Sequence, residues 1–436
     1  MLIRKEFFGN LIWSDYDKCY YVALNKDIDL YVTNIIDKKI DINKKGNDLD
    51  IQNVVLSDLI KMGYNEHVRI IDPKSDVLSA PLEYYYDYTD ACNLKCQHCY
   101  NRKQLNHNTM TKEQIEYVIM DMYNNGVMRL HLAGGEPTLY KDRLNTYMSI
   151  ANKLGIMTSM SSNGTTFDDD IGKILIENNV TSFTISIESA IEEKNASIRG
   201  TGVLKKACEG IKKAIEYRKS HNGKYNIAIK MSYDVNTTRE DFVNMIELAI
   251  DLNVDILKLI NPERCEFHEE RYYSSVANKY FEIQAIIREL REIYKDKLKM
   301  TIVNSPVNLF CTVGLPKMKG CIGAQELIAI NPDGKVTPCL MNKYDLGNIF
   351  DGGIKHIYRG NKISQYRNKI SDYDCSGCKY HAQCRGGCQV RKKVEYGDIK
   401  SIDPLCPIKN KVQTKDVVEG PQKYKNFKKI NVFHSL

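Results

Sequence analysis

The sequence lacks long apolar runs, a secretory signal and any block of like charge. No run of apolar residues is long enough to cross a membrane. The first 21 residues show no basic stretch followed by an apolar one, so we expect a cytoplasmic protein. The net charge of +7 is spread along the chain, which mildly favours an acidic partner. We expect neither nucleic acid nor a membrane as a partner.

Cysteine, in contrast, is abundant, with 14 in 436 residues. A disulfide scaffold is one explanation, but such scaffolds belong to short secreted chains. A chain of this length predicts two or three domains, and 43% hydrophobic residues suffice for their cores. Closely spaced cysteines in a long chain without a signal favour metal binding instead.

The first cysteine group has the spacing C-x3-C-x2-C, formed by Cys92, Cys96 and Cys99. Closely spaced thiolates on one loop can hold a single iron–sulfur cluster. A [4Fe–4S] cluster needs four ligands, so three cysteines leave one iron open to another molecule. Zinc is the alternative, but it normally takes four protein ligands, and no second Cys or His pair lies nearby.

This loop resembles that of the radical S-adenosylmethionine (SAM) enzymes, where the cysteines follow the first strand and an aromatic residue follows the last. Here the cysteine loop follows the apolar-aromatic run 82–88, and Tyr100 follows its last cysteine, Cys99. In that family the open iron binds the amino and carboxylate groups of SAM, and the reduced cluster cleaves SAM to a 5′-deoxyadenosyl radical. The resemblance implies that Tyr100 lies near the adenine.

Strand-like and helix-like segments alternate from Tyr84 to about Asn261, which is typical of parallel βα units. The expected strands are 84–89, 128–133, 156–161, 182–187, 227–233 and 256–260, and the expected helices are 112–125, 142–154, 169–178, 203–219 and 240–252. A further helix is expected over 272–294. Six units match the partial (β/α)6 barrel, of the α/β class, that the resemblance implies for residues 81–305. Chemistry in parallel barrels lies at the carboxyl ends of the strands.

Several motifs follow these strands. The resemblance assigns to SAM binding Gly134, Gly135 and Glu136 after the second strand, Ser162 after the third, Ser186 and Glu188 after the fourth, and Arg199 beyond it. Glycines let the backbone approach a ligand, and an arginine can fork a carboxylate. Taken alone, the glycine motif is usually just a turn, and Arg199 by itself would be a surface arginine before a helix. Glu263 and Cys265, after the sixth strand, are weaker candidates for substrate contact, and an ordinary loop is the alternative.

Residues 1–80 are expected to form a separate small α+β domain. Apolar runs over 7–13 and 19–24 predict a hairpin, and 28–36 and 51–62 predict helices, with 70–81 as a linker. This order resembles the winged-helix-like peptide-recognition domain of peptide-modifying radical SAM enzymes. In that family the leader of a precursor peptide adds a strand to the hairpin edge. A cap on the barrel is the alternative.

The second cysteine group covers residues 306–410. Its pattern is Cys321-x12-Gly334-x4-Cys339, then Cys375-x2-Cys378-x5-Cys384-x3-Cys388, then Cys406. This pattern resembles the SPASM domain of radical SAM enzymes, which holds two auxiliary [4Fe–4S] clusters. A hairpin over 326–338 is expected to bring Cys321 and Cys339 together.

Two such clusters need eight ligands, and the pattern supplies seven; Cys311 is the candidate for the eighth. The resemblance implies Cys311, Cys321, Cys339 and Cys388 for the first auxiliary cluster, and Cys375, Cys378, Cys384 and Cys406 for the second. A buried or surface thiol is the alternative for Cys311. Residues 411–436 are expected to form a basic C-terminal tail.

The resemblance implies an oxidoreductase that removes hydrogen from a residue of a ribosomally made precursor peptide, leading to a crosslink or other oxidation. It further implies SAM, three [4Fe–4S] clusters and an external electron donor such as flavodoxin or ferredoxin. The alternative enzyme is an anaerobic sulfatase maturase, which forms formylglycine. In those enzymes an Asp follows the second SPASM cysteine, whereas Leu340 follows Cys339 here. A non-catalytic electron carrier is the third alternative, and it would not need the SAM motifs.

Overall fold

The computed structural model describes most of the barrel and much of the C-terminal region, with shorter pieces of the N-terminal region. The described residues are 2–6, 9–14, 19–22, 26–36, 59, 69–71, 78–101, 108–260, 273–303, 321–369, 375, 377, 378, 384, 386–411 and 427–429. Among the helices in these ranges, none is both long and apolar enough to cross a membrane.

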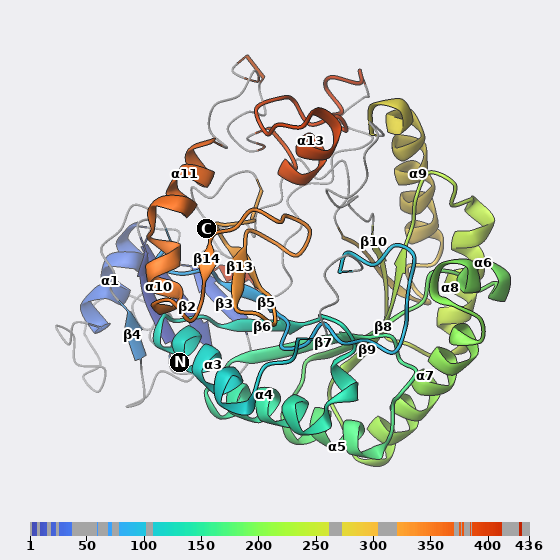
Figure 1. The fold of residues 1–436 in the computed structure, drawn as a ribbon, viewed down its shortest axis with the longest axis horizontal. Coiled ribbons are helices and arrows are strands. Elements are labelled where there is room, and N and C mark those ends of the chain that lie inside the picture. The colour runs from blue at the N-terminus through green and yellow to red at the C-terminus, as the bar shows by residue number, and fades with distance from the viewer. Residues whose placement is uncertain are drawn as a thin grey trace, which may run out of the picture.

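A large curved sheet forms the centre of the molecule (Figure 1). Seven consecutive parallel strands compose most of it: β5 (Glu83–Tyr86), β6 (Arg129–Leu132), β7 (Met157–Ser162), β8 (Ser182–Ser186), β9 (Asn226–Ser232), β10 (Ile256–Ile260) and β11 (Lys299–Val303). Beyond β5 the sheet continues through β12 (Leu327–Ile330), β13 (Lys335–Thr337) and β14 (Gly347–Asn348). The domain with the second cysteine group therefore extends the sheet of the barrel.

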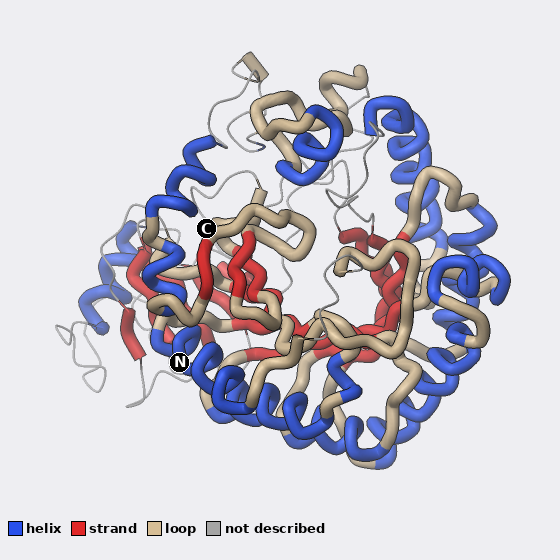
Figure 2. Tube along the Cα trace, viewed as in Figure 1, coloured by secondary structure: helices blue, strands red, loops and turns tan. Residues whose placement is uncertain are grey.

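Helices cover the outer side of the sheet, as Figure 2 shows in blue around the red strands. They are α3 (Lys112–Asn124), α4 (Lys141–Lys153), α5 (Asp169–Glu177), α6 (Glu192–Arg199), α7 (Val203–Ser220), α8 (Arg239–Asp251) and α9 (Tyr273–Ile293), with a short 3-10 helix η1 (Pro137–Leu139) after β6. Their starts are encoded locally: Thr111 and Thr238 begin α3 and α8 with capping boxes, and Asp168 caps α5.

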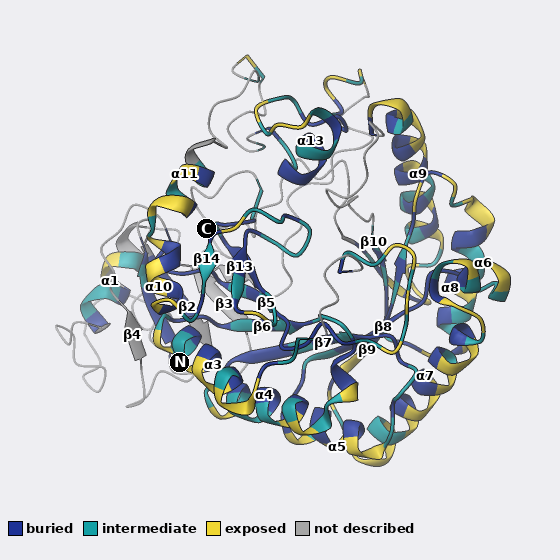
Figure 3. Ribbon diagram, viewed as in Figure 1, coloured by how far each residue is buried: buried dark blue, intermediate teal, exposed yellow. Residues whose placement is uncertain are grey.

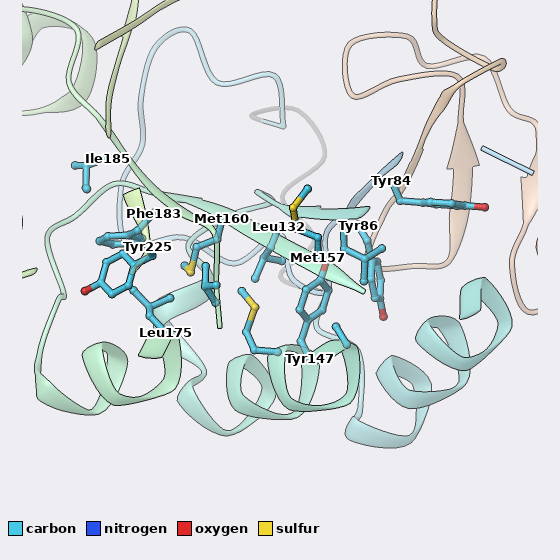
Figure 4. Packing of buried hydrophobic residues seen from close by; sticks show 14 of the residues in the cluster. Tyr84, Tyr86, Leu132, Tyr147, Met157, Met160, Leu175, Phe183, Ile185 and Tyr225 are labelled. Carbon is cyan, nitrogen blue, oxygen red and sulfur yellow. The ribbon is translucent and has the colours of Figure 1, made fainter. Parts of the chain in front are cut away.

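The core lies between the sheet and these helices. Leu132, Met160 and Phe183 on the strands are 0% exposed, and they face Tyr147 and Leu175 from the helices (Figure 4). Figure 3 shows the complementary pattern, with exposed residues along the outer faces of the helices. Alternation along each strand sends one set of side chains into this core and the other set to the inner face of the curve.

The alternating strand and helix predictions for the barrel are confirmed to within one to three residues, including α9. Among the described α-helices and strands of the barrel, two were not predicted: the eight-residue α6 and β11, which pairs with β10 as a seventh parallel strand. Both are short, and α6 has a weakly apolar sequence with Asn195 and Arg199 as its buried residues. A helix whose buried side chains are polar gives little hydrophobic periodicity.

The N-terminal region forms a second sheet with strand order β15-β3-β2-β1-β4. Its strands are β1 (Leu2–Glu6), β2 (Gly9–Ser14), β3 (Cys19–Val22), β4 (Arg69–Ile71) and β15 (Phe427–Lys429), and α1 (Lys26–Ile36) follows β3. The predicted hairpin is present as β2 and β3. The expected linker over 70–81 includes part of β4, which pairs with β1. Apart from residue 59, the helix expected over 51–62 lies outside the described residues.

The C-terminal chain returns to this N-terminal sheet. Residues Phe427–Lys429, within the expected tail, form β15 and pair with β3 in parallel. The β3 edge is the hairpin edge at which the resemblance places a leader peptide. An incoming strand would therefore meet a position that the chain itself fills.

The described part of the second cysteine region contains the predicted hairpin, formed by β12 and β13. It also contains the helices α10 (Gly353–Tyr358), α11 (Asn361–Lys369) and α13 (Gln389–Tyr396). Helix α10 packs beside α3, because Asp121 of α3 accepts a hydrogen bond from Ile354 N at 2.7 Å. In Figure 1 α13 lies across the curve from the barrel strands.

Candidate functional site

The three cysteines of the first group lie on the loop after β5. Cys92, Cys96 and Cys99 are free and half-buried. Burial raises the pKa of Cys92 to about 11, and the charges of Cys96 and Cys99 add to that effect because they lie near it. As a thiol alone Cys92 would stay protonated at neutral pH, whereas a metal would displace its proton.

The loop carries three possible ligands for an iron–sulfur cluster. Within the described ranges, no three Cys, His, Asp or Glu side chains converge on a point where one metal ion could sit. An iron–sulfur cluster does not require such convergence, because each cysteine binds a separate iron. Three neighbouring, unpaired thiols on one loop therefore match a [4Fe–4S] cluster held at three of its irons.

The turn after β6 packs against the start of the cysteine loop. Gly135 N donates to Thr89 O at 2.9 Å, and Glu136 N donates to Ala91 O at 2.8 Å. A Cβ on Gly134 would lie 2.4 Å from Thr89 O, and one on Gly135 would lie 2.1 Å from Ala91 O. Gly134 also has φ +70, a conformation that glycine adopts without strain. Two glycines are therefore needed for this backbone contact.

Glu136 is completely buried and hydrogen-bonded within the protein. Its carboxylate accepts from Thr138 Oγ1 at 2.5 Å, Ser162 Oγ at 2.8 Å and Asn163 N at 2.6 Å. Burial raises the pKa of Glu136, although these donors oppose the shift. The side chains of Glu136 and Ser162 thus tie the turns after β6 and β7 together, and they shape the loops around the cysteines.

A second set of hydrogen bonds joins the β7 turn to the cysteine loop. Asn163 Nδ2 donates to Asn93 Oδ1 at 2.7 Å, and Asn93 Nδ2 donates to Thr165 Oγ1 at 3.0 Å. Asn163 Oδ1 in turn accepts from Thr165 N at 2.9 Å. Asn93 was not predicted as a site residue. Its position between Cys92 and Cys96 in the sequence is the feature from which its place at the site could have been predicted.

Glu188 and Arg199 form a buried ion pair beside the cysteines. Arg199 Nε donates to Glu188 Oε1 at 2.9 Å, and His98 Nε2 lies 3.1 Å from the same oxygen. Glu188 Oε2 also accepts from Ser232 N at 2.7 Å. Burial opposes ionisation, but the charges of Arg199 and His98 hold the pKa of Glu188 well below its usual range.

This ion pair also contacts the cysteine loop. Arg199 Nη1 lies 3.9 Å from Cys96 Sγ, and Gln97 N donates to Ile198 O at 2.9 Å. Part of the Arg199 fork is thus engaged by Glu188, and one nitrogen points toward the cluster loop. Ser186 is buried on β8 and lies opposite Lys230 of β9.

Tyr100 is hydrogen-bonded to an aspartate, Asp87, that was not predicted as a site residue. Tyr100 Oη donates to Asp87 Oδ2 at 3.4 Å, and Asp87 Oδ1 accepts from Ala133 N at 2.9 Å. Burial raises the pKa of Asp87 to about 7, and the hydrogen bonds oppose this shift. Lys343, four residues after Cys339, lies 5.6 Å from the centroid of the Tyr100 ring. The two cysteine regions therefore meet at Tyr100.

The segments that carry Cys321 and Cys339 lie side by side, as the hairpin predicted. Ala324 N donates to Pro338 O at 3.1 Å, and a Cβ on Gly323 would lie 3.5 Å from Cys321 Sγ. Burial lowers the pKa of Lys392 to about 8, and the charges of Asp403, Cys388, Cys321 and Cys375 oppose this shift. These thiols are consequently near one lysine on α13.

A buried ion pair organises the last cysteines. Arg391 Nε donates to Asp403 Oδ1 at 2.9 Å, and Cys388 N donates to Asp403 Oδ2 at 2.7 Å. The charges of Asp403 and Cys406 contribute to raising the pKa of Cys384 to about 12, after burial as the main cause. Asp403 therefore holds the Cys384–Cys388 turn near Cys406. Burial raises the pKa of Cys406, and the charge of Cys378 adds to that shift.

Three of the predicted residues cannot be placed. Glu263, Cys265 and Cys311 lie outside the described residues.

Two family comparisons match this arrangement. Residues 86–249 match the Radical SAM superfamily, and residues 321–389 match the SPASM iron–sulfur cluster-binding domain. The first match covers the cysteine loop and the strands that surround it, and the second covers six of the later cysteines.

Curated relatives differ in what they act on. A GTP 3′,8-cyclase of Alkaliphilus metalliredigens is 27% identical over 59% of this chain and 80% of its own length. A PqqA peptide cyclase of Bradyrhizobium diazoefficiens is 22% identical over 77% of this chain and 88% of its own. A cysteine-type anaerobic sulfatase-maturating enzyme of Clostridium perfringens is 27% identical over 69% of this chain and 86% of its own.

Among solved structures, Streptococcus suis SuiB bound to S-adenosylmethionine has a TM-score of 0.69 at 17% identity. The match covers 93% of this chain and 98% of that one. SuiB bound to the precursor peptide SuiA gives a TM-score of 0.67 at 17% identity, with the same coverage. The likeness in fold thus extends beyond the two matched families.

Proposed function

The chain belongs to the radical SAM enzymes that carry a SPASM domain, and we propose that it modifies a residue of a ribosomally made precursor peptide. The observation that carries the proposal is the extent of the SuiB likeness, 93% of this chain, because SuiB has been solved with a precursor peptide. The GTP cyclase match, in contrast, covers only 59% of the chain. The PqqA peptide cyclase and the sulfatase maturase cover more of it.

In this proposal Cys92, Cys96 and Cys99 would hold a [4Fe–4S] cluster to which SAM would bind. With an electron from an external donor such as flavodoxin or ferredoxin, the bound groups would supply a 5′-deoxyadenosyl radical able to remove hydrogen from the peptide. The protein positions the reactants: the Gly134–Gly135 turn fixes the cysteine loop through backbone hydrogen bonds. Arg199, braced by Glu188, points a guanidinium nitrogen toward Cys96, where it can meet the SAM carboxylate.

Two auxiliary clusters complete the proposal. Cys375, Cys378, Cys384 and Cys406 would hold one of them, and Asp403 keeps two of these thiols near each other. Cys321, Cys339 and Cys388 would hold the other, with Cys311 as its fourth ligand. A cluster closed in this way would have no open iron for substrate, so its role would be electron transfer. The protein would then hold about twelve irons.

Residues 1–80 would bind the leader of the peptide by β-augmentation. The described part of this region contains the hairpin, formed by β2 and β3, and its outer edge pairs with β15 as a parallel strand. That edge therefore can pair with an extended segment, and a leader would have to replace β15 there.

Formylglycine formation is the second candidate, because the C. perfringens sulfatase-maturating enzyme is 27% identical over 69% of this chain. The absence of an acidic residue directly after Cys339 counts against it, since Leu340 and Met341 occupy those positions. The two functions give different products: a carbon that becomes an aldehyde, or a peptide that loses two hydrogens in a crosslink.

The test is anaerobic reconstitution followed by reaction with SAM, dithionite and a short peptide encoded beside this chain. We expect 5′-deoxyadenosine and a peptide lighter by two hydrogens. Replacing Cys92, Cys96 and Cys99 together by alanine should remove about four irons and abolish SAM cleavage. SAM cleavage that persists in this triple variant would contradict the cluster assignment. An aldehyde in the product would favour the second candidate.

A further inference from the structure

The inner face of the barrel sheet is polar and basic. In β9 and β10 the outward-facing Ile229, Leu257 and Leu259 are fully buried against the helices. Lys230 and Lys258 alternate with them, face inward and keep partial exposure. Barrel interiors are usually filled by branched apolar side chains. Lysines in these positions therefore need another explanation.

The two lysines are direct neighbours across the strand pair. Lys258 lies opposite Lys230 in the parallel register of β9 and β10. Neighbouring strands are about 4.8 Å apart. Like charges directly opposite each other destabilise a sheet. Arg129 of β6 lies within electrostatic reach as well, because its charge lowers the pKa of Lys258 and that of His131.

The nearby carboxylates are already engaged elsewhere. Glu83 lies 3.6 Å from Arg129, and Glu188 is paired with Arg199. Asp87, whose charge also acts on Lys230, accepts hydrogen bonds from Tyr100 Oη and Ala133 N. Lys258 Nζ donates to Thr184 Oγ1 at 2.8 Å and lies 3.5 Å from Ser182 Oγ, which are neutral partners. In the part of the chain that the structure describes, no carboxylate forms an ion pair with Lys230 or Lys258.

Lys230 also lies close to the cofactor site. Lys230 lies opposite Ser186 in the register of β8 and β9. Burial lowers the pKa of Lys230, and the charges of Arg199, Glu188, Asp87 and Cys99 are near enough to affect it. An anion bound by Lys230 would therefore lie beside Arg199 and the cysteine loop.

We propose that Lys230 and Lys258 together bind the carboxylate of an acidic side chain in the substrate peptide. The inference rests on the proposed peptide substrate and adds to it a preference for Asp or Glu near the modified residue. Two ammonium groups on adjacent strands can each donate to one oxygen of a carboxylate. A carboxylate between them would offset the repulsion between the two ammonium groups. The SAM carboxylate is the other source of the same chemistry.

The test uses the reconstituted holoenzyme with two matched probes, N-acetyl-glutamate N-methylamide and its glutamine counterpart. We expect the glutamate probe to bind about tenfold more tightly, as measured by ligand-observed NMR. The double variant Lys230→Met, Lys258→Met should lose this preference. The conservative double variant Lys230→Arg, Lys258→Arg should keep the preference for the glutamate probe. The control Lys213→Met, which changes an exposed lysine on α7, should keep it as well. Iron content checks that each variant is folded.

Separate measurements distinguish the sources of the anion. The dissociation constant of SAM should change less than twofold in the methionine double variant, whereas a rise of tenfold or more would assign the lysines to SAM. Equal binding of the two probes to the unmodified enzyme would overturn the proposal. Tight binding of GTP that displaces the glutamate probe and needs both lysines would overturn it as well. None of these readouts depends on peptide turnover, so failure of the proposed function is seen independently in the mass of the peptide.

Discussion

Lys258 is a residue whose surroundings disfavour its own charge. Burial, followed by the charges of Lys230 and Arg129, lowers its pKa to about 8, although Glu83 opposes the shift. Lys299 also lowers it, and the hydroxyls of Ser182 and Thr184 are its neutral contacts. An unfolded lysine has a pKa of about 10.4. Between these two values the unfolded chain binds more protons than the folded one, so stability rises with pH in that window.

Replacing Lys258 by methionine should therefore stabilise the protein most where the lysine is charged. We expect a gain of about 1–3 kcal/mol at pH 7, which shrinks as the pH approaches about 10. The measurement is anaerobic urea unfolding of the variant and the unmodified protein at both pH values. Lys213→Met is the control, with little change at either pH. A gain that is the same at pH 7 and pH 10 would argue against a charge penalty.

Among the elements, the turn after β6 is the one that sets the position of the cysteine loop. Gly134→Ala should displace that loop, because the new Cβ would lie 2.4 Å from Thr89 O. Gly202→Ala is a matched control: Gly202 has φ +74, close to the +70 of Gly134, but nothing lies within 4 Å of its Cβ position. Both variants carry the same backbone strain, of about 1 kcal/mol.

We expect the Gly134 variant to lose most of the iron bound by the first cysteine group and to lower SAM cleavage about a hundredfold, while the Gly202 variant retains both. Iron analysis and the yield of 5′-deoxyadenosine measure the two effects. Equal behaviour of the variants would show that backbone strain, and not contact with Thr89, limits the turn.

The strand β15 gives a second prediction for an element. If a leader peptide pairs with β3, it must compete with Phe427–Lys429, which already pair there. A chain ending at Lys411 should bind the cognate precursor peptide about three- to tenfold more tightly, because the competing segment is gone. Lys428→Ala in the full chain is the control, since it keeps the backbone that makes the pairing. An unchanged dissociation constant, measured by fluorescence anisotropy, would place the leader elsewhere.

Across the whole molecule, one buried ion pair attaches the N-terminal sheet to the barrel. Arg4 of β1 is fully buried and pairs with Glu6 at 2.6 Å. Its guanidinium also donates to Ala80 O at 2.6 Å and to Gly126 O, at the end of α3, at 3.3 Å. The same side chain thus contacts the sheet, the segment before β5 and the barrel.

Arg4→Ala should cost about 3–5 kcal/mol of unfolding free energy, because Glu6 would remain buried without its partner. The double variant Arg4→Met, Glu6→Leu should recover much of that loss, since it removes both charges together. Lys112→Ala serves as a comparison: its pair with Asp142 is exposed on both sides, and its loss should cost less than about 1 kcal/mol. Urea unfolding followed by circular dichroism gives these values. A cost below that of Lys112→Ala would show that Arg4 does not join the two parts.

The sequence by itself determined the cofactor chemistry and the order of elements. Cysteine spacing is a local property, so C-x3-C-x2-C and the later seven-cysteine pattern identified both families without coordinates. Hydrophobic periodicity is local as well, and it located six strands and their helices. Helix starts at Thr111 and Thr238 follow from residues three positions apart.

Only the tertiary structure decided which polar residues support the site. Glu136 could be identified as a residue after a strand, but its burial under Ser162 and Asn163 depends on the neighbouring strand. The contact between Asp87 and Tyr100 and the pairing of Arg391 with Asp403 join residues 12 or 13 positions apart, through loops with no periodicity. The opposition of Lys230 and Lys258 depends on sheet register. Register is fixed by packing of the outward faces against the helices, which no local pattern encodes.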